Sequence, residues 1–175
     1  MKVLKFCLLP LFVVIAAVYL YGYLAAPEDW NVEVSRVIAA EPAEIHPWVE
    51  DLRRWPEWQE YEEVTFEFTF EGEEKGVGAI AVSRSERNEV RWEITASDPE
   101  RGVWFDELLE GDVPAKGAIL YEVVAEGTKV TWLDHGSLGE GPILRIFHPM
   151  METALGDAFG KHLALLAEKV EAAGE

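Results

Sequence analysis

The fold is decided by residues 149–173, PMMETALGDAFGKHLALLAEKVEAA, which lie near the end of the chain. Apolar residues recur there every three to four positions, and this spacing predicts an amphipathic helix. Such a helix spans about 37 Å at 1.5 Å per residue, so it can lie across a whole sheet. A curved sheet that holds one long helix often leaves a cavity in which small apolar ligands bind. The apolar stripe comprises Met150, Met151, Ala154, Leu155, Ala158, Phe159, His162, Leu163, Leu166 and Val170.

The residues before this helix predict a sheet. Residues 31–39 alternate and are rich in Val and Ile, which favours a strand, and residues 42–51 favour a short helix with a proline near its start. Residues 55–58, WPEW, are expected to form a second turn or short helix. The connections between later strands are too short for parallel crossovers, so we predict an antiparallel sheet of six to seven strands in an α+β fold. The later strands are expected at residues 64–70, 77–84, 89–97, 103–109, 117–124 and 129–135.

The N-terminal segment stands apart from this domain. Residues 6–26 contain no charged side chain, and about 20 apolar residues are enough to cross the hydrocarbon core of a membrane. We therefore expect residues 1–27 to form a transmembrane anchor; the alternative is a cleaved signal peptide. The lysines at Lys2 and Lys5 predict a single-pass protein with a cytoplasmic N-terminus and an extracytoplasmic, periplasmic domain.

The charge of the chain excludes one class of partner. The formal net charge is -18, and binding to nucleic acid rests on neutralising phosphates with Lys and Arg. We therefore expect no nucleic-acid partner. The acidity favours a solvated, repulsive surface, with an acidic docking face for a basic protein as the alternative. The only cysteine, Cys7, excludes an intrachain disulfide.

Two carboxylates share the phase of apolar residues on their strands. Asp134 is in phase with Val130 and Trp132, and Glu107 is in phase with Val103 and Phe105. Both are therefore candidates to project inward, where an ionised group needs a partner or a ligand. The alternative is that each lies at a strand end and reaches solvent at the rim of the sheet.

Other catalytic signals are few. Asp134 facing His148 or His162 would make a carboxylate and imidazole pair able to move protons, whereas a histidine in the core or at the helix rim is the simpler interpretation. The four histidines, which include His46 and His135, show no ligand spacing that indicates a metal site. The sequence indicates no cofactor.

Aromatic and flexible apolar residues suit the walls of a cavity. Methionine adapts to varied apolar shapes, and aromatic rings supply large apolar surfaces. The residues on the inward strand phase and on the helix stripe are the candidates for ligand contact. They are Trp92, Trp132, Met151, Leu155 and Phe159, with Glu107 as a polar member.

Several local signatures together resemble a known superfamily. They are the first strand at residues 34–40, VSRVIAA, the segment 51–58, DLRRWPEW, the strand start 76–78, GVG, and residues 127–132, GTKVTW, followed by the long closing helix. In this order they resemble the START-like, or SRPBCC, superfamily, in particular its polyketide cyclase/dehydrase-type members, over residues 30–173. The resemblance implies a helix-grip fold, in which an antiparallel sheet wraps around the C-terminal helix with a ligand cavity between them. It does not imply one activity, because relatives include lipid carriers, receptors, cyclases and oxygenase domains.

These observations lead to one expected function and two alternatives. We expect a membrane-anchored domain that binds a small hydrophobic or lipidic molecule in the cavity between sheet and helix. The first alternative is a cyclase or dehydrase-type enzyme that uses pocket carboxylates or histidines. The second is an acidic protein-interaction module, whose protein partner the sequence does not identify.

Overall fold

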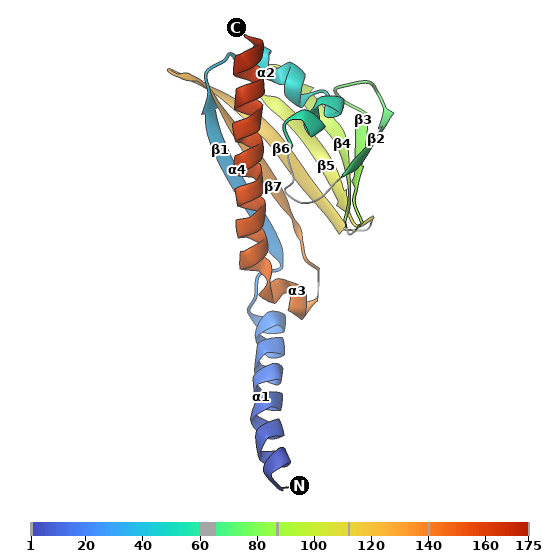
Figure 1. Cartoon of the computed structure of the whole chain (residues 1–175), viewed down its shortest axis with the longest axis vertical. Helices are drawn as coiled ribbons and strands as arrows, with labels where there is room; N and C mark the ends of the chain where they lie inside the picture. The colour runs from blue at the N-terminus through green and yellow to red at the C-terminus, as the bar shows by residue number, and fades with distance from the viewer. Residues whose placement is uncertain (1, 60–65, 87, 112, 140, 175) are drawn as a thin grey trace.

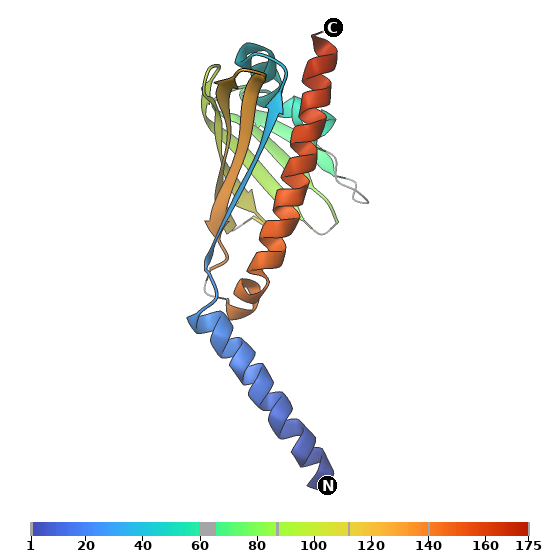
Figure 2. The same cartoon turned by 90° about the vertical axis from the view of Figure 1, so that its left-hand side faces the viewer.

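The chain folds into a sheet with one long helix across it and a separate helix at the N-terminus (Figure 1). The computed structural model describes residues 2–59, 66–86, 88–111, 113–139 and 141–174, with side chains from Pro10 onward. Helix α4 (His148–Ala173) lies along one face of the sheet, and Figure 2 shows the sheet and α4 as two layers. The closing helix predicted for residues 149–173 is therefore present, and it begins one residue earlier than predicted.

The described residues form a seven-stranded sheet in the order β1-β7-β6-β5-β4-β3-β2. Every neighbouring pair is antiparallel, which confirms the predicted α+β class. Because β1 pairs with β7, the first and last strands of the domain lie side by side. Residues 64 and 65 of the second predicted strand lie outside the described residues. The strands are β1 (Asp29–Ile38), β2 (Glu67–Gly72), β3 (Ala79–Arg84), β4 (Glu89–Asp98), β5 (Gly102–Leu109), β6 (Val113–Val124) and β7 (Gly127–Ser137).

Two short helical segments follow β1, as the sequence predicts. Helix α2 (Pro42–Val49) starts with a proline at its first position, where no amide hydrogen bond is lost, and the Glu44 carboxylate accepts from the Glu41 amide at 2.8 Å. The segment η1 (Leu52–Glu57) is a 3₁₀ helix whose start is capped by Asp51. A further short helix, α3 (Pro142–Ile146), precedes α4 and was not predicted.

The N-terminal segment is the helix α1 (Lys2–Leu24), which projects away from the domain in Figure 1. In the part of the chain that the structure describes, no helix is both long and apolar enough to cross a membrane. The transmembrane span predicted for residues 1–27 therefore has no support from this structure.

The hydrophobic core lies between the sheet, the segments α2 and η1, and the C-terminal half of α4. Trp55 of η1 is fully buried, and its ring lies between 5.3 and 6.0 Å from those of Trp58, Trp92, Phe105 and Trp132. Its indole N–H donates to the carbonyl of residue 49 at 2.9 Å, which satisfies the one polar group of the side chain. The aromatic segment at residues 55–58 thus joins η1 to the inner face of the sheet.

Candidate functional site

A cavity of about 580 Å³ lies between the inner face of the sheet and the first half of α4. Side chains from β1, β3, β4, β5 and β7 line it on one side, and residues between positions 151 and 162 of α4 line it on the other. Its volume lies in the range of small-molecule sites, and most of its wall is apolar. A cavity is therefore present between the sheet and the closing helix, where the sequence predicted one.

The predicted contact residues meet in this cavity. Trp132 and Phe159 stack with ring centroids 4.5 Å apart and planes only 4° from parallel, which joins β7 to α4. Met151 and Leu155 are partly buried against the same core. All six predicted contact residues, Trp92, Glu107, Trp132, Met151, Leu155 and Phe159, line the cavity. That they contact a ligand remains a prediction.

Glu107 and Asp134 form a buried pair of carboxyl groups in the wall of the cavity. Their side chains are only 8% and 4% exposed, so neither reaches the rim of the sheet. The two carboxyl groups lie close enough to shift each other's pKa. The Trp30 indole N–H donates to Asp134 Oδ1 at 2.6 Å, and the Trp92 indole lowers the pKa of Glu107 against the effect of burial. The structure therefore favours the inward placement over the alternative of a solvated strand end.

The pairing register explains how these carboxyls meet. Glu107 on β5 and Asp134 on β7 are separated by β6, where their partners are Ala115 and Gly117. Ala115 is a small residue beside Glu107, and Gly117 makes room for the Phe105 ring, which a Cβ at that position would overlap. Gly136 serves the same end, because a Cβ there would overlap the Trp30 ring that holds Asp134.

The surroundings favour a proton shared within this pair. Burial raises the pKa of Glu107 well above its usual value, and the nearby Asp134 carboxyl adds to the effect. Burial also raises the pKa of Asp134, although the hydrogen bonds from Trp30 and Glu107 oppose that shift. Two ionised carboxylates in contact would repel strongly in an apolar site, so we expect Glu107 to carry the proton and donate it to Asp134.

This pair makes the stability of the fold depend on pH. A carboxyl whose pKa is higher in the folded state than its usual 4.5 keeps its proton where the unfolded chain has lost it. The stability it contributes is complete below that value and falls as pH rises through the folded pKa, by up to about 1.4 kcal/mol per pH unit for one proton. We expect urea unfolding to show a shallower decline between about pH 5 and pH 8 for Glu107→Gln than for the wild type. Parallel pH profiles would contradict the raised pKa, because surface repulsion is common to both proteins.

The two candidate histidines occupy different places. His162 lines the cavity, and its ring lies 5.8 Å from that of Trp132. His148 lies at the start of α4, where its Nε2 donates to the Asp29 carbonyl at 2.8 Å, and it does not belong to the cavity wall. The structure places Asp134 beside Trp30 and Glu107, and it places His148 beside the Asp29 carbonyl. The pairing of Asp134 with a histidine stays a prediction.

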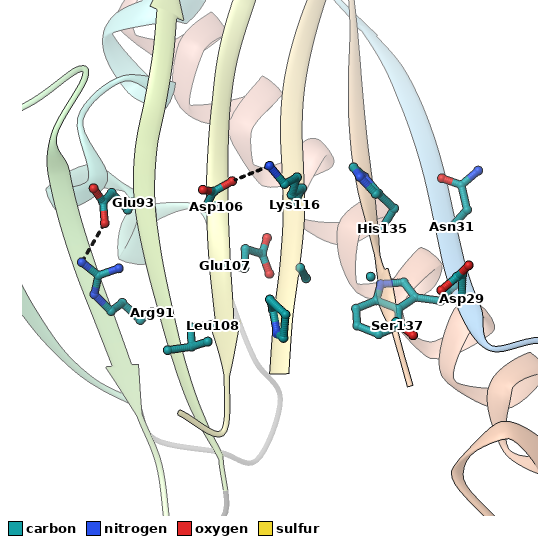
Figure 3. A pocket seen from close by; sticks show the side chains of 14 residues that line it. Asp29, Asn31, Arg91, Glu93, Asp106, Glu107, Leu108, Lys116, His135 and Ser137 are labelled. Atoms are coloured by element: carbon teal, nitrogen blue, oxygen red, sulfur yellow. Dashed lines mark hydrogen bonds and ion pairs between the residues drawn. The ribbon is translucent and has the colours of Figure 1, made fainter. Parts of the chain in front are cut away.

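A larger hollow, of about 830 Å³, lies on the opposite face of the sheet (Figure 3). Its charged side chains project outward from the strands and pair with one another, as Lys116 does with Asp106 at 3.4 Å and Arg91 with Glu93 at 2.8 Å. Pairs of this kind on a surface are solvated and contribute little energy. We favour the inner cavity as the functional site because it lies between the sheet and α4 and carries buried polar groups that need partners.

Among the members of the cavity wall that sequence reasoning missed, two bear on the buried polar groups. Trp30 is 2% exposed and positions Asp134, and its phase with Val32 on β1 was the signal that could have placed it inside. Ser83 on β3 is 1% exposed, and its hydroxyl has no hydrogen-bond partner among the residues that the structure describes. No sequence pattern distinguishes Ser83, because serine is common on strands that face solvent.

An antiparallel sheet that wraps around a C-terminal helix and leaves a cavity between the two is the helix-grip architecture. The chain belongs to the family described as polyketide cyclase / dehydrase and lipid transport, whose model matches residues 29–171. The resemblance to the SRPBCC superfamily stated above is thereby confirmed. No curated protein matches the chain.

Solved structures of several proteins share the fold. Protein TTHA0849 of Thermus thermophilus is 21% identical with a TM-score of 0.66, over 83% of this chain and 100% of that one. Protein CV1439 of Chromobacterium violaceum is 14% identical with a TM-score of 0.62, over 83% and 99% of the two chains. DynU16, from the dynemicin biosynthetic locus, is 17% identical with a TM-score of 0.56, over 81% and 47%. At these identities the likeness shows the fold alone.

Proposed function

We propose that this protein binds a small hydrophobic or lipidic molecule in the cavity between the sheet and α4. The observation that carries the proposal is the cavity of about 580 Å³ with a stacked aromatic pair, Trp132 and Phe159, in its wall. A space of this size holds a ring system or part of an acyl chain. Burying apolar ligand surface there contributes about 25 cal/mol per Å² before the costs of association.

Native mass spectrometry of the full chain, released from the membranes in which it was expressed, tests this proposal. We expect a fraction of the protein to carry one small molecule that is extractable with organic solvent. A ligand-free protein that also takes up no added apolar compound would contradict the proposal.

A second candidate function is acid and base catalysis in the same cavity. One observation favours it, namely a pair of buried carboxyl groups with raised pKa values next to a largely apolar cavity. The two functions differ in what happens to the bound molecule. A ligand that leaves the protein with unchanged mass after prolonged incubation supports binding alone, whereas a product lighter by one water supports a dehydrase-type reaction.

We further propose that α1 attaches the protein to a membrane, with its N-terminus in the cytoplasm and the domain on the extracytoplasmic side. Large apolar residues of α1 are between 47% and 69% exposed, and residues 11–15 carry them around every side of the helix. A helix that is apolar on all sides is stable when protein or lipid covers it. The exposed residues are Leu11, Phe12, Val13, Val14, Ile15, Val18, Tyr19, Leu20, Tyr21, Tyr23 and Leu24.

The surface next to α1 continues this apolar character. Helix α3 lies against the end of α1, close enough that a Cβ on Gly22 would overlap the Pro142 carbonyl. Four large apolar side chains between positions 143 and 150, in α3, at its end and at the start of α4, are between 53% and 70% exposed. They are Ile143, Leu144, Phe147 and Met150. This patch supports a position for α3 at the membrane surface.

Fractionation of cells that express the full chain tests the attachment. We expect the wild type to stay with the membranes in alkaline carbonate and the double variant Val13→Glu/Ile15→Glu to be released, because a charge within an apolar membrane helix costs about 2.5–3.5 kcal/mol. Val123→Glu, at an exposed apolar position on β6, serves as the matched control and should stay bound. Release of the wild type would contradict the attachment, and digestion of the domain from the cytoplasmic side alone would contradict the orientation.

A further inference from the structure

We infer that the cavity selects amphipathic molecules that end in a protonated amine, which binds between the carboxyl groups of Glu107 and Asp134. The inference rests on the proposed ligand-binding function and specifies the class of ligand. The apolar body of the ligand would lie along Trp132 and Phe159, while the amine reaches the sheet.

The first argument is the state of the two carboxyl groups. The two carboxyl groups are buried side by side, the Trp30 indole N–H donates to Asp134 at 2.6 Å, and the Trp92 indole interacts with Glu107. Both indoles are neutral donors, so neither cancels the charge of an ionised carboxylate. A buried carboxylate is stabilised most by a cation in direct contact, and an ammonium group supplies one with three N–H donors.

The second argument is the balance of charge in the whole cavity wall. Glu107 and Asp134 contribute two buried carboxyl groups, the exposed residues Glu110 and Asp157 contribute two more, and among the described lining residues the exposed Lys161 is the one lysine. His162 also faces the cavity from α4. An excess of carboxyl groups disfavours ligands that end in a carboxylate or a phosphate and favours a positively charged end.

The third argument is an unsatisfied polar group in the same wall. The Ser83 hydroxyl is buried on β3 and lacks a hydrogen-bond partner among the described residues. It lies two residues along β3 from Ala81, whose partner Trp92 is itself paired with Glu107. Burying a hydroxyl without a hydrogen bond costs free energy. The place of Ser83 in the cavity wall therefore indicates that a polar group of the ligand forms this hydrogen bond.

Binding of an amine changes the proton content of the pair. The arriving ammonium favours ionisation of both carboxyl groups, so the proton held by Glu107 leaves to solvent. No bond within the ligand is made or broken. The exchange is measurable, because the heat of binding then depends on the ionisation enthalpy of the buffer.

The test compares three compounds with the same ring body and different ends. We would titrate the full chain in lipid nanodiscs with 2-(1-naphthyl)ethylamine, 2-(1-naphthyl)ethanol and 1-naphthylacetate at neutral pH, with empty nanodiscs as the blank for partitioning. We expect the amine to bind at least about tenfold more tightly than the other two and to release protons, because only the amine carries a charge complementary to the pair.

Two variants test whether the preference for the amine depends on Glu107 and Asp134. Glu107→Gln and Asp134→Asn keep the size of each side chain, and each should reduce the preference for amine over alcohol to less than about threefold. Equal binding of all three compounds, or tighter binding of the alcohol or the anion, would overturn this inference and leave the cavity as a ligand site. Absence of binding by all three would overturn the proposed function as well.

Discussion

Replacement of Trp55 by Ala is expected to cost about 3–5 kcal/mol of folding free energy, the range for truncating a buried tryptophan. The ring is fully buried and contacts four other aromatic rings, and the indole N–H is satisfied by a backbone carbonyl. Removing it leaves a cavity between η1 and the sheet that the surrounding rings cannot refill. Urea unfolding followed by the fluorescence of the remaining tryptophans measures the loss.

Trp104→Ala is the matched control for this substitution. Trp104 lies on β5 at a partly exposed position, where the guanidinium of Arg101 lies 5.7 Å from its ring. Its truncation should cost less than half as much as that of Trp55. Equal losses for the two variants would contradict the central place of Trp55 in the core.

A larger side chain on the α4 side of the cavity is expected to weaken ligand binding strongly without unfolding the protein. Ala158 of α4 lines the cavity, so the variant Ala158→Trp places an indole in the space that a ligand would occupy. We expect the affinity for the uncharged probe 2-(1-naphthyl)ethanol to fall at least about tenfold, a loss of about 1.4 kcal/mol. Calorimetric titration of the full chain measures it, and the circular dichroism spectrum shows whether the fold is kept.

The control for this variant carries the same residue outside the cavity. Ala172 lies in the last turn of α4 at an exposed position, so Ala172→Trp adds an indole to the same helix without narrowing the cavity. It should bind the probe as the wild type does. A normal affinity in Ala158→Trp would show that the probe binds elsewhere.

Most of the fold could be predicted from the sequence, because helices and strands leave periodic patterns of apolar residues along the chain. The alternation along β4 and the second half of the α4 stripe, from Phe159 to Val170, predicted the buried faces correctly, whereas Met150 in the first half is 70% exposed. Helix α3 was missed because five residues are too few to show a helical period. The limits of β6 and β7 were set too short, since strand ends depend on the pairing of neighbours rather than on their own composition.

The site could be predicted only in part from the sequence, because it depends on contacts between residues that are far apart along the chain. Phase along a strand indicated that Glu107 and Asp134 could face inward, but their contact depends on the register that β6 sets between β5 and β7. Likewise, the hydrogen bond from Trp30 to Asp134 joins residues that are 104 positions apart in the sequence. Interactions of this kind follow from the register of the sheet and leave no local pattern.

The most direct measurement of the central claim locates an apolar molecule inside the protein. Crystals soaked with 1-bromonaphthalene allow the bromine to be found by its anomalous scattering. The account predicts a bromine peak within the cavity, near Trp132, Phe159 and Met151. An empty cavity, with bromine only on the outer surface at concentrations that saturate binding in solution, would contradict it.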